Sequence, residues 1–302
     1  MANQANIQLV PRAVKLIDTA TRWAHVTGRF ARTKPLGFMG LAICTLSLLM
    51  GLFGNIFATE DPNFGGDYRQ NLMGPSGDNW FGTDHQGRDV YSRVVYGTRV
   101  SLQVAFFAIV IGTFGGFIVG IISGYAGGKV DMVLQRITDS FLAFPTILLA
   151  LTLVAVLGQG MNSVIIAVAI AFAPNSVRVT RGTVLSVRKN DYIDASKTIG
   201  ASDLRIMVRH ILPNVLAPFL IIASVALGSA ILVEASLSFL GMGVPPPWPS
   251  WGRMLSGSAS EYALIAPWLV IFPGLAITIL VLGFNLFGDA LRDIWDPRLR
   301  GR

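Results

Sequence analysis

The sequence predicts an all-α protein that crosses a membrane about six times. Of its 302 residues, 52% are hydrophobic and only 14% are charged, whereas a soluble domain carries about 25% charged residues. The mean hydropathy of the chain is +0.58. The apolar residues gather in long runs, and a bilayer-spanning helix needs ~20 such residues. Helices are expected because a backbone in lipid must satisfy its own hydrogen bonds.

Six apolar runs reach this length once their neutral neighbours are counted. They lie at 36–58, 100–124, 141–158, 164–177, 215–240 and 265–287. Strands of a membrane barrel would alternate in polarity over ~10 residues, and no such alternation is visible. The first run is not expected to be a cleaved signal peptide, because ~35 mostly polar residues precede it and it is too long for that role.

The runs divide the chain into three expected parts. These are a cytoplasmic tail at 1–35, a first transmembrane helix with an extracytoplasmic segment at 36–98, and a five-helix core at 99–302. The stretch 88–99 is predicted to form an amphipathic helix at the membrane interface, ahead of the second span. Its apolar face would consist of Val90, Tyr91, Val94 and Val95.

Lysines and arginines predict the orientation of the helices. With six spans, all but five of the 24 fall on the side that holds both termini; the five are Arg69, Arg88, Arg93, Arg99 and Arg253. Cytoplasmic loops carry the excess of Lys and Arg in membrane proteins. Both termini and a long loop at 186–213 are therefore expected in the cytoplasm. The segments near 59–98 and 243–262 are expected outside.

Several kinds of site are excluded by composition. One cysteine, Cys44, and three scattered histidines leave no basis for a disulfide framework or a metal site. The net charge of +7 does not indicate nucleic acid, because the basic residues flank apolar runs. The stretch 82–89 resembles a phosphate-binding loop only superficially, since Arg88 and Asp89 stand where Lys and Ser or Thr are needed. No bound cofactor is expected in this chain.

Glycines recur every fourth residue in the second apolar run, and they share one helix face: Gly112, Gly116, Gly120 and Gly124. Small residues at this spacing let two membrane helices approach closely. We therefore interpret these glycines as a packing surface rather than a binding site.

Glu234 interrupts an otherwise apolar run at 215–240. An ionisable residue inside a membrane is a candidate for function, because burying its charge is costly away from water. Two interpretations stay open: Glu234 lines a translocation path, or it sits where a polar cavity or the outer interface begins.

The predicted cytoplasmic loop at 186–213 reads as two short helices separated by Gly200, a residue suited to the end of a helix. Ser202 or Asp203 can cap the second helix. That helix would carry an apolar stripe and a separate basic face; the stripe is Leu204, Met207, Val208 and Ile211, and the basic face is Arg205 and Arg209. The segment could lie on the membrane surface as an amphipathic hairpin or bind a cytoplasmic partner.

This loop resembles the Glu-Ala-Ala loop of bacterial ABC-importer permeases. The resemblance is carried by Asp194-Ala195-Ser196, by Gly200 after three intervening residues, and by Leu212-Pro213. The sequence departs from the family pattern at three positions, where Asp194 replaces Glu, Ser196 replaces Ala and His210 replaces Ile.

Other stretches are similar to the dipeptide, oligopeptide and nickel branch of that family, and to its C-type permease. They include Gly-Thr-Asp at 82–84 followed by Gly-Arg-Asp-Val at 87–90, Arg-His-Ile-Leu-Pro-Asn at 209–214, Leu-Ser-Phe-Leu-Gly at 237–241 and Pro-Ser-Trp-Gly at 249–252. The resemblance covers most of the chain.

The resemblance implies the fold of a type I ABC-importer permease in a bacterial inner membrane. It implies a second, homologous permease subunit, two cytoplasmic ATPase subunits that bind ATP and Mg²⁺, and an extracytoplasmic substrate-binding protein. This chain would supply half of the pore and no catalytic residue. Its ATPase-coupling residues would be Asp194, Ala195, Ser196, Gly200, Leu204, Arg205, Met207, Val208, Arg209, Ile211, Leu212 and Pro213. Di- or oligopeptides are the expected substrates, with nickel, glutathione and oligosaccharides left open.

Two other functions remain to be distinguished from import driven by ATP. One is an ion-coupled secondary transporter, which would usually need a chain of intramembrane ionisable groups, whereas Glu234 is the clear case here. The other is a membrane scaffold or receptor with no transport of its own.

Overall fold

The computed structural model describes residues 28–63, 68–257 and 261–295, so most of the expected tail at 1–35 lies outside the described residues. Five described helices are long and apolar enough to cross a membrane. They are α2 (Pro35–Leu52), α4 (Val90–Ala126), α7 (Met161–Arg188), α10 (Leu212–Phe239) and α13 (Trp268–Trp295). A sixth candidate span is the pair α5 (Gly128–Leu142) and α6 (Thr146–Leu157), which is bent by 92°. The prediction of an all-α protein with about six spans is confirmed.

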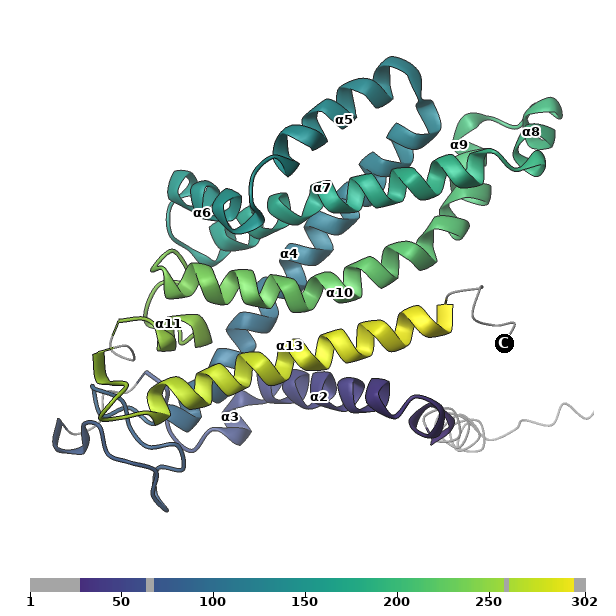
Figure 1. Ribbon diagram of the computed structural model, residues 1–302. Helices are drawn as coiled ribbons and strands as arrows, with labels where there is room; N and C mark the ends of the chain where they lie inside the picture. The colour runs from purple at the N-terminus through teal and green to yellow at the C-terminus, as the bar shows by residue number, and fades with distance from the viewer. Residues whose placement is uncertain (1–27, 64–67, 258–260, 296–302) are drawn as a thin grey trace, which may run out of the picture.

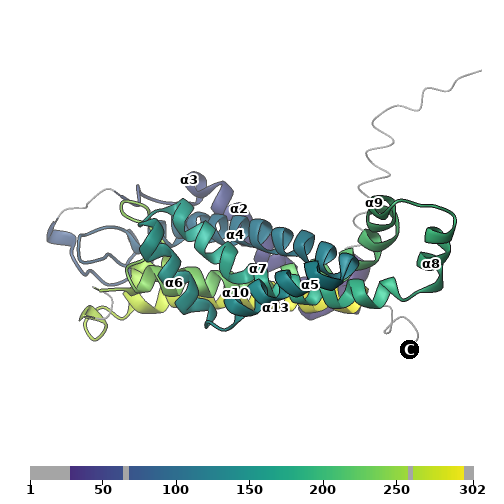
Figure 2. The same ribbon diagram turned by 90° about the horizontal axis from the view of Figure 1, so that it is seen from above.

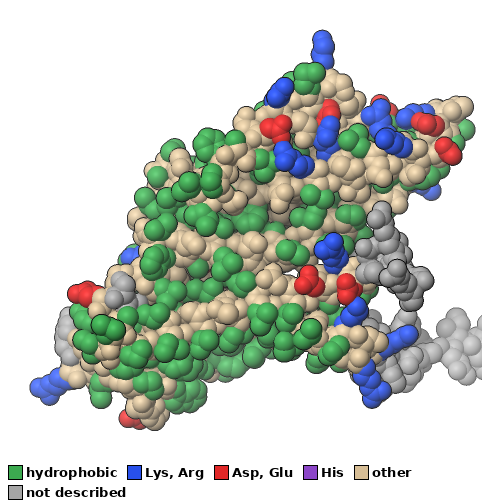
Figure 3. Space-filling model, viewed as in Figure 1, with side chains coloured by type: hydrophobic (Ala, Val, Ile, Leu, Met, Phe, Trp, Pro, Cys, Tyr) green, Lys and Arg blue, Asp and Glu red, His purple; other side chains and the backbone are tan. Residues whose placement is uncertain are grey.

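The long helices form an elongated bundle, in which α2 lies next to α13, α13 next to α10, and α10 next to α7 (Figure 1). One end of the bundle carries α8 (Asp191–Thr198), and the opposite end carries α3 (Gly54–Phe57) and α11 (Trp251–Leu255). We call these the α8 end and the α11 end. Hydrophobic side chains cover the flank of the bundle, whereas charged side chains gather near α5 and the α8 end (Figure 3). This distribution suits a membrane around the middle of the bundle.

The four glycines expected on one face of the second span form a close contact between α4 and α7. A Cβ added to Gly112 would lie 2.2 Å from the carbonyl oxygen of Ala169, and one added to Gly116 would lie 2.4 Å from that of Ala173. The contact continues to the α8 end, where Gly124 faces the side chain of Val184. The prediction of a packing surface is confirmed, and we call this contact the glycine seam.

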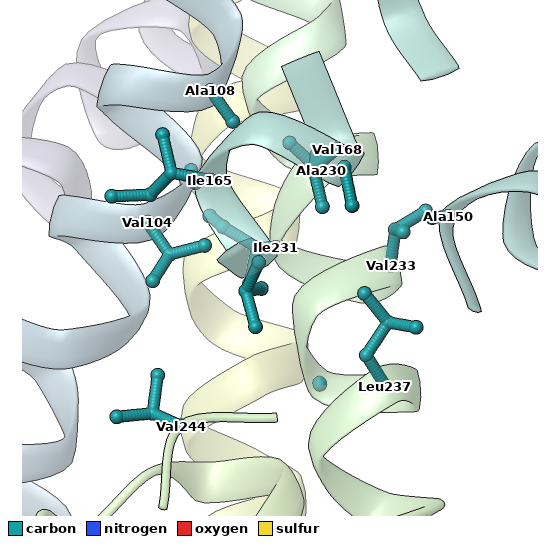
Figure 4. Packing of buried hydrophobic residues seen from close by; sticks show 14 of the residues in the cluster. Val104, Ala108, Ala150, Ile165, Val168, Ala230, Ile231, Val233, Leu237 and Val244 are labelled. Carbon is teal, nitrogen blue, oxygen red and sulfur yellow. The ribbon is translucent and has the colours of Figure 1, made fainter. Parts of the chain in front are cut away.

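The main hydrophobic core adjoins the Gly112 end of the glycine seam, since Ala169 belongs to both. Side chains from α4, α7 and α10 converge there, as Figure 4 shows for Val104, Ala108, Ile165, Val168, Ala230 and Ile231. All of these are 9% exposed or less. The core therefore fixes the position of α10, the helix that follows the predicted cytoplasmic loop.

The stretch 88–99 does not form a separate interfacial helix, contrary to expectation. It is the beginning of α4, which runs unbroken from Val90 to Ala126 and therefore crosses the expected part boundary at 98/99. Its apolar face is buried against α13 and the segment before it, through Ala266 and Leu269. Asp89 caps the helix, since its side chain accepts a hydrogen bond from the backbone N–H of Ser92 at 2.7 Å.

The apolar run at 141–158 was expected to be one span, and the structure divides it. Pro145 interrupts the helix because proline lacks a backbone N–H and disfavours helical backbone before it. The following helix, α6, has 12 residues, so it is ~18 Å long. That length is short of the ~30 Å hydrocarbon core.

We expect Gly112→Ala to destabilise the protein by about 1–3 kcal/mol, because the new methyl group would overlap the backbone of α7. Thermal unfolding of the purified chain, followed by tryptophan fluorescence, measures this effect. Gly115→Ala is the matched control on the same helix, since its Cβ would meet no atom within 4 Å. A loss of stability in Gly115→Ala equal to that in Gly112→Ala would contradict the role of the seam.

Candidate functional site

The predicted cytoplasmic loop protrudes from the bundle at the α8 end (Figure 2). Its first helix, α8, is followed by Gly200 at φ +81°, a left-handed conformation that favours glycine. The turn at Gly200 is therefore confirmed. The second helix is not short, contrary to expectation: α9 (Asp203–Ile206) passes through a π-helical turn, η2 (Met207–Ile211), directly into α10. Ser202 occupies the N-cap position without a capping hydrogen bond from its side chain.

The base of the loop is built into a second hydrophobic core. Ile193, Ile206 and Ile211 are all fully buried, and they pack with Val184 of α7 and Phe117 of α4. The loop is therefore fixed to three long helices rather than lying loosely on a membrane surface.

The predicted apolar stripe is divided by the structure. Ile211 is buried and Met207 is partly buried in the second core, whereas Leu204 is 68% and Val208 55% exposed. Residues four apart across the wider π-helical turn stay on one face, whereas residues three apart, such as Leu204 and Met207, are separated. The exposed aliphatic side chains of the loop are therefore Leu204, Val208 and Ile199, of which Ile199 is 84% exposed.

The other residues predicted for coupling fall into an exposed set and a structural set. Asp194, Ala195, Arg205, Arg209 and Pro213 are exposed. Ser196 is buried and donates a hydrogen bond to the carbonyl oxygen of Tyr192 at 2.7 Å, and Leu212 is half-buried at the start of α10. Sequence reasoning missed Ile199, although an apolar residue directly before Gly200 in a polar segment is a signal for it.

Polar contacts attach the loop to the ends of α4 and α7. The hydroxyl of Tyr125, a residue only 8% exposed, donates to Asp203 Oδ1 at 2.6 Å. The guanidinium of Arg188 lies 5.7 Å from the centre of the same ring, within the range of a cation–π contact. Nearby, Arg181 makes a two-bond ion pair with Asp131 of α5, with both N–O distances at 2.6 Å. The α8 end thus holds two sets of polar contacts, one that joins the loop to α4 and one that joins α7 to α5.

Glu234 lies near the opposite end of α10 and is fully buried. Its two carboxylate oxygens accept hydrogen bonds from Ser101 of α4 at 2.9 Å and from Ser238 at 2.7 Å. Its own chain encloses it in this conformation, so its part in a translocation path stays a prediction. What the structure shows is a polar link between α4 and α10.

The same region holds α11 between these two helices. The indole N–H of Trp251 donates to the carbonyl oxygen of Val94 at 2.9 Å. Gly97 leaves room for that ring, since its Cβ would lie 2.8 Å from Trp251 Cδ1. Gly252 approaches the backbone of Ala235 in the same way. Among the described residues, no group of three or more His, Cys, Asp or Glu could hold a metal ion.

We expect Glu234→Ala to lower the free energy of unfolding by about 1–3 kcal/mol, because two buried serine hydroxyls would lose their acceptor. Glu234→Gln should cost less, since it keeps the size and one acceptor oxygen. Thermal unfolding compares the two variants. The control is Ser236→Ala, a half-buried serine whose hydroxyl donates to the carbonyl oxygen of Leu232 within α10. Substrate uptake by the Glu234→Gln variant tests whether Glu234 lines a translocation path. Unchanged uptake would remove Glu234 from the functional residues.

Comparison with known proteins identifies the family. Residues 116–301 match the family described as binding-protein-dependent transport system inner membrane component. The chain is 43% identical to the dipeptide transport system permease protein DppC of Alkalihalophilus pseudofirmus, over 92% of this chain and 90% of that one. It is 40% identical to the glutathione transport system permease protein GsiD of Pectobacterium atrosepticum, over 93% and 92%.

A solved structure agrees at the level of the fold. A chain from inward-facing crystals of the MetNI methionine ABC transporter superposes with a TM-score of 0.56 at 20% identity, covering 67% of this chain and 96% of that one. The bundle of long apolar helices is the architecture expected of an inner membrane component, so the structure and the family match agree. The chain therefore belongs to the family of binding-protein-dependent transport system inner membrane components, and it is a multi-pass permease subunit of an ABC importer.

Proposed function

We propose that this chain forms half of the pore of an importer for di- or oligopeptides that is driven by ATP. The proposal draws on the relatives named for dipeptide and glutathione transport, since glutathione is itself a short peptide. A second, homologous permease would complete the pore. A substrate-binding protein would deliver the peptide from outside, and both termini would lie on the cytoplasmic side of a bacterial inner membrane.

The observation that carries the coupling role is the exposed apolar surface of Ile199, Leu204 and Val208 at the α8 end. Exposed apolar side chains grouped among polar ones are typical of protein-binding surfaces. Arg205 and Arg209 border them, which adds a charge that an acidic partner surface would complement. We assign this surface to docking of a cytoplasmic ATPase subunit, which would bind ATP and Mg²⁺ itself.

The buried base of the loop supports transmission of force. Ile193, Ile206 and Ile211 are fixed in the second core, and Tyr125 binds Asp203. A packed interior transmits displacement rather than absorbing it. Movement of the docked ATPase subunits would therefore shift the ends of α4, α7 and α10 together and open the pore alternately to each side.

An ion-coupled carrier is the alternative, and its energy source distinguishes it. Uptake of a labelled dipeptide by cells should persist when a protonophore is added while ATP is held constant; loss of uptake would favour the carrier.

Native mass spectrometry of the cognate substrate-binding protein would identify its ligand and so decide between peptides, nickel, glutathione and oligosaccharides. Loss of uptake on deletion of this subunit, with the partners still assembled, would exclude a scaffold.

Cysteine labelling tests the orientation. In a Cys44→Ser background, an impermeant thiol reagent added outside intact cells should label Ser76→Cys and spare Ala195→Cys and Lys129→Cys. All three positions are exposed, so protection reports the side of the membrane rather than burial. Labelling of Ala195→Cys with protection of Ser76→Cys would invert the proposed topology.

Gly200→Val tests the coupling role. The valine Cβ would meet no atom within 4 Å, but a side chain at this φ costs about 1 kcal/mol or more. The turn should therefore distort while the membrane core stays intact. We expect normal assembly, at least about fivefold weaker stimulation of ATPase activity by loaded binding protein, given that free-energy cost, and loss of uptake.

Gly182→Ala is the control for this variant, because it is exposed on α7, outside the loop, and its Cβ also meets nothing within 4 Å. It should keep full stimulation and full uptake. If Gly200→Val behaves in the same way as Gly182→Ala, the loop does not transmit the motion.

A further inference from the structure

A polar cavity at the α11 end is not explained by the loop or by the packing of the spans. Its volume is about 510 Å³, within the range of about 300–1,000 Å³ that is typical of small-molecule sites. The turn before α4, the first turns of α4 and the segment around α11 form its walls. Six of the side chains that line it are used below: Arg88, Arg93, Arg253, His85, Trp248 and Tyr262.

Three arginines from two distant parts of the chain line this one cavity. Arg93 is only 7% exposed, and its Nη1 donates to the carbonyl oxygen of Pro62 at 2.7 Å. Arg253 donates its Nη1 to the carbonyl oxygen of Val244 at 3.1 Å. A guanidinium has five N–H groups, so these contacts leave donors of both side chains for a ligand.

The acidic groups of the cavity do not neutralise these arginines. Asp84 is shared between two of the arginines: Oδ2 lies 2.7 Å from Arg88 Nε and 3.6 Å from Arg93 Nε. Its Oδ1 accepts from the backbone N–H groups of Gln86 and Arg88 at 2.8 and 3.0 Å. Within the described ranges, Arg253 and Glu261 form no ion pair. Three guanidinium groups therefore face two carboxylates, which leaves one positive charge in excess at this cavity.

Among the residues that the structure describes, one further polar atom at this cavity has no partner. The Nδ1 of His85 is buried there without a hydrogen bond, and a buried polar group is normally paired. Tyr262 lies parallel to the His85 ring with 6.3 Å between ring centres, and Trp248 is 53% exposed. The site thus combines excess positive charge, an unpaired nitrogen and aromatic walls.

We propose that this cavity binds the carboxylate of a small organic anion, with the C-terminal carboxylate of a short peptide as the ligand. The peptide rests on the proposed function, whereas the preference for a carboxylate rests on the arginines alone. Guanidinium groups hold carboxylates through paired, charge-assisted hydrogen bonds, and aromatic side chains pack against the aliphatic parts of such a ligand. The cavity would then hold peptide at the end of the pore predicted to face outward.

Calorimetric titration of the purified permease complex, without the substrate-binding protein, tests this site directly. The probes are N-acetyl-dialanine and its C-terminal amide. We expect the acid to bind and the amide not to bind. Arg253→Gln should weaken binding of the acid at least about tenfold, because a charge-assisted hydrogen bond is removed. Glu261→Gln should strengthen it, because a negative charge leaves the same cavity.

Arg292→Gln is the matched control, since Arg292 is exposed near the opposite end of the bundle and lines a different cavity. Absence of binding to the wild type, equal binding of acid and amide, or equal weakening by Arg292→Gln would overturn the proposal. Weaker ATPase stimulation by the binding protein in Arg253→Gln, with unchanged binding of the probe, would assign the arginines to an acidic side chain of that protein instead. The titration needs no transport, so its failure is distinct from failure of peptide import.

Discussion

The close approach of α4 and α7 along the glycine seam is the contact on which the other parts of the structure depend. Lipid supplies little hydrophobic drive between helices, so association in a membrane depends on packing at short range. Gly112 and Gly116 bring α4 against backbone carbonyls of α7, and the hydroxyl of Ser176 donates across the seam to the carbonyl oxygen of Thr113 at 2.8 Å. The main core and the base of the loop are both built on this pair of helices.

Polar contacts are concentrated at the two ends of the bundle, on either side of an apolar middle. At the α8 end, Tyr125 binds Asp203 and Arg181 binds Asp131. Towards the α11 end, Glu234 accepts from Ser101. A hydrogen bond has one preferred geometry, so each of these contacts favours one alignment of the two elements that it joins. We infer that the seam holds the helices together and that the polar contacts set their register.

Much of the fold could be predicted from the sequence, because it depends on composition and on short spacings. The lengths of the apolar runs predicted the spans, the repeat of glycines at every fourth position predicted the seam, and Gly200 predicted the turn of the loop. Each of these signals lies within a few residues of the feature that it specifies.

The errors arose where local pattern does not determine three-dimensional position. The apolar face at Val90 and Val94 would suit a membrane surface as well as it suits α13, and only the tertiary contact with Leu269 decides. The π-helical turn at Met207–Ile211 has no distinctive residue, so the break in the stripe was invisible. Glu234 and Ser101 are 133 residues apart, and no spacing rule connects them.

The continuity of α4 links the two ends of the molecule. At 37 residues it is ~55 Å long, and it is helical throughout and contains no proline. Its first turn contributes Arg93 to the polar cavity, and its last turn contributes Tyr125 to the loop. If α4 tilts and so changes both sites, thermodynamic linkage makes the effect mutual. A ligand in the cavity would then change the affinity for the cytoplasmic partner. That partner would change the affinity for the ligand by the same free energy.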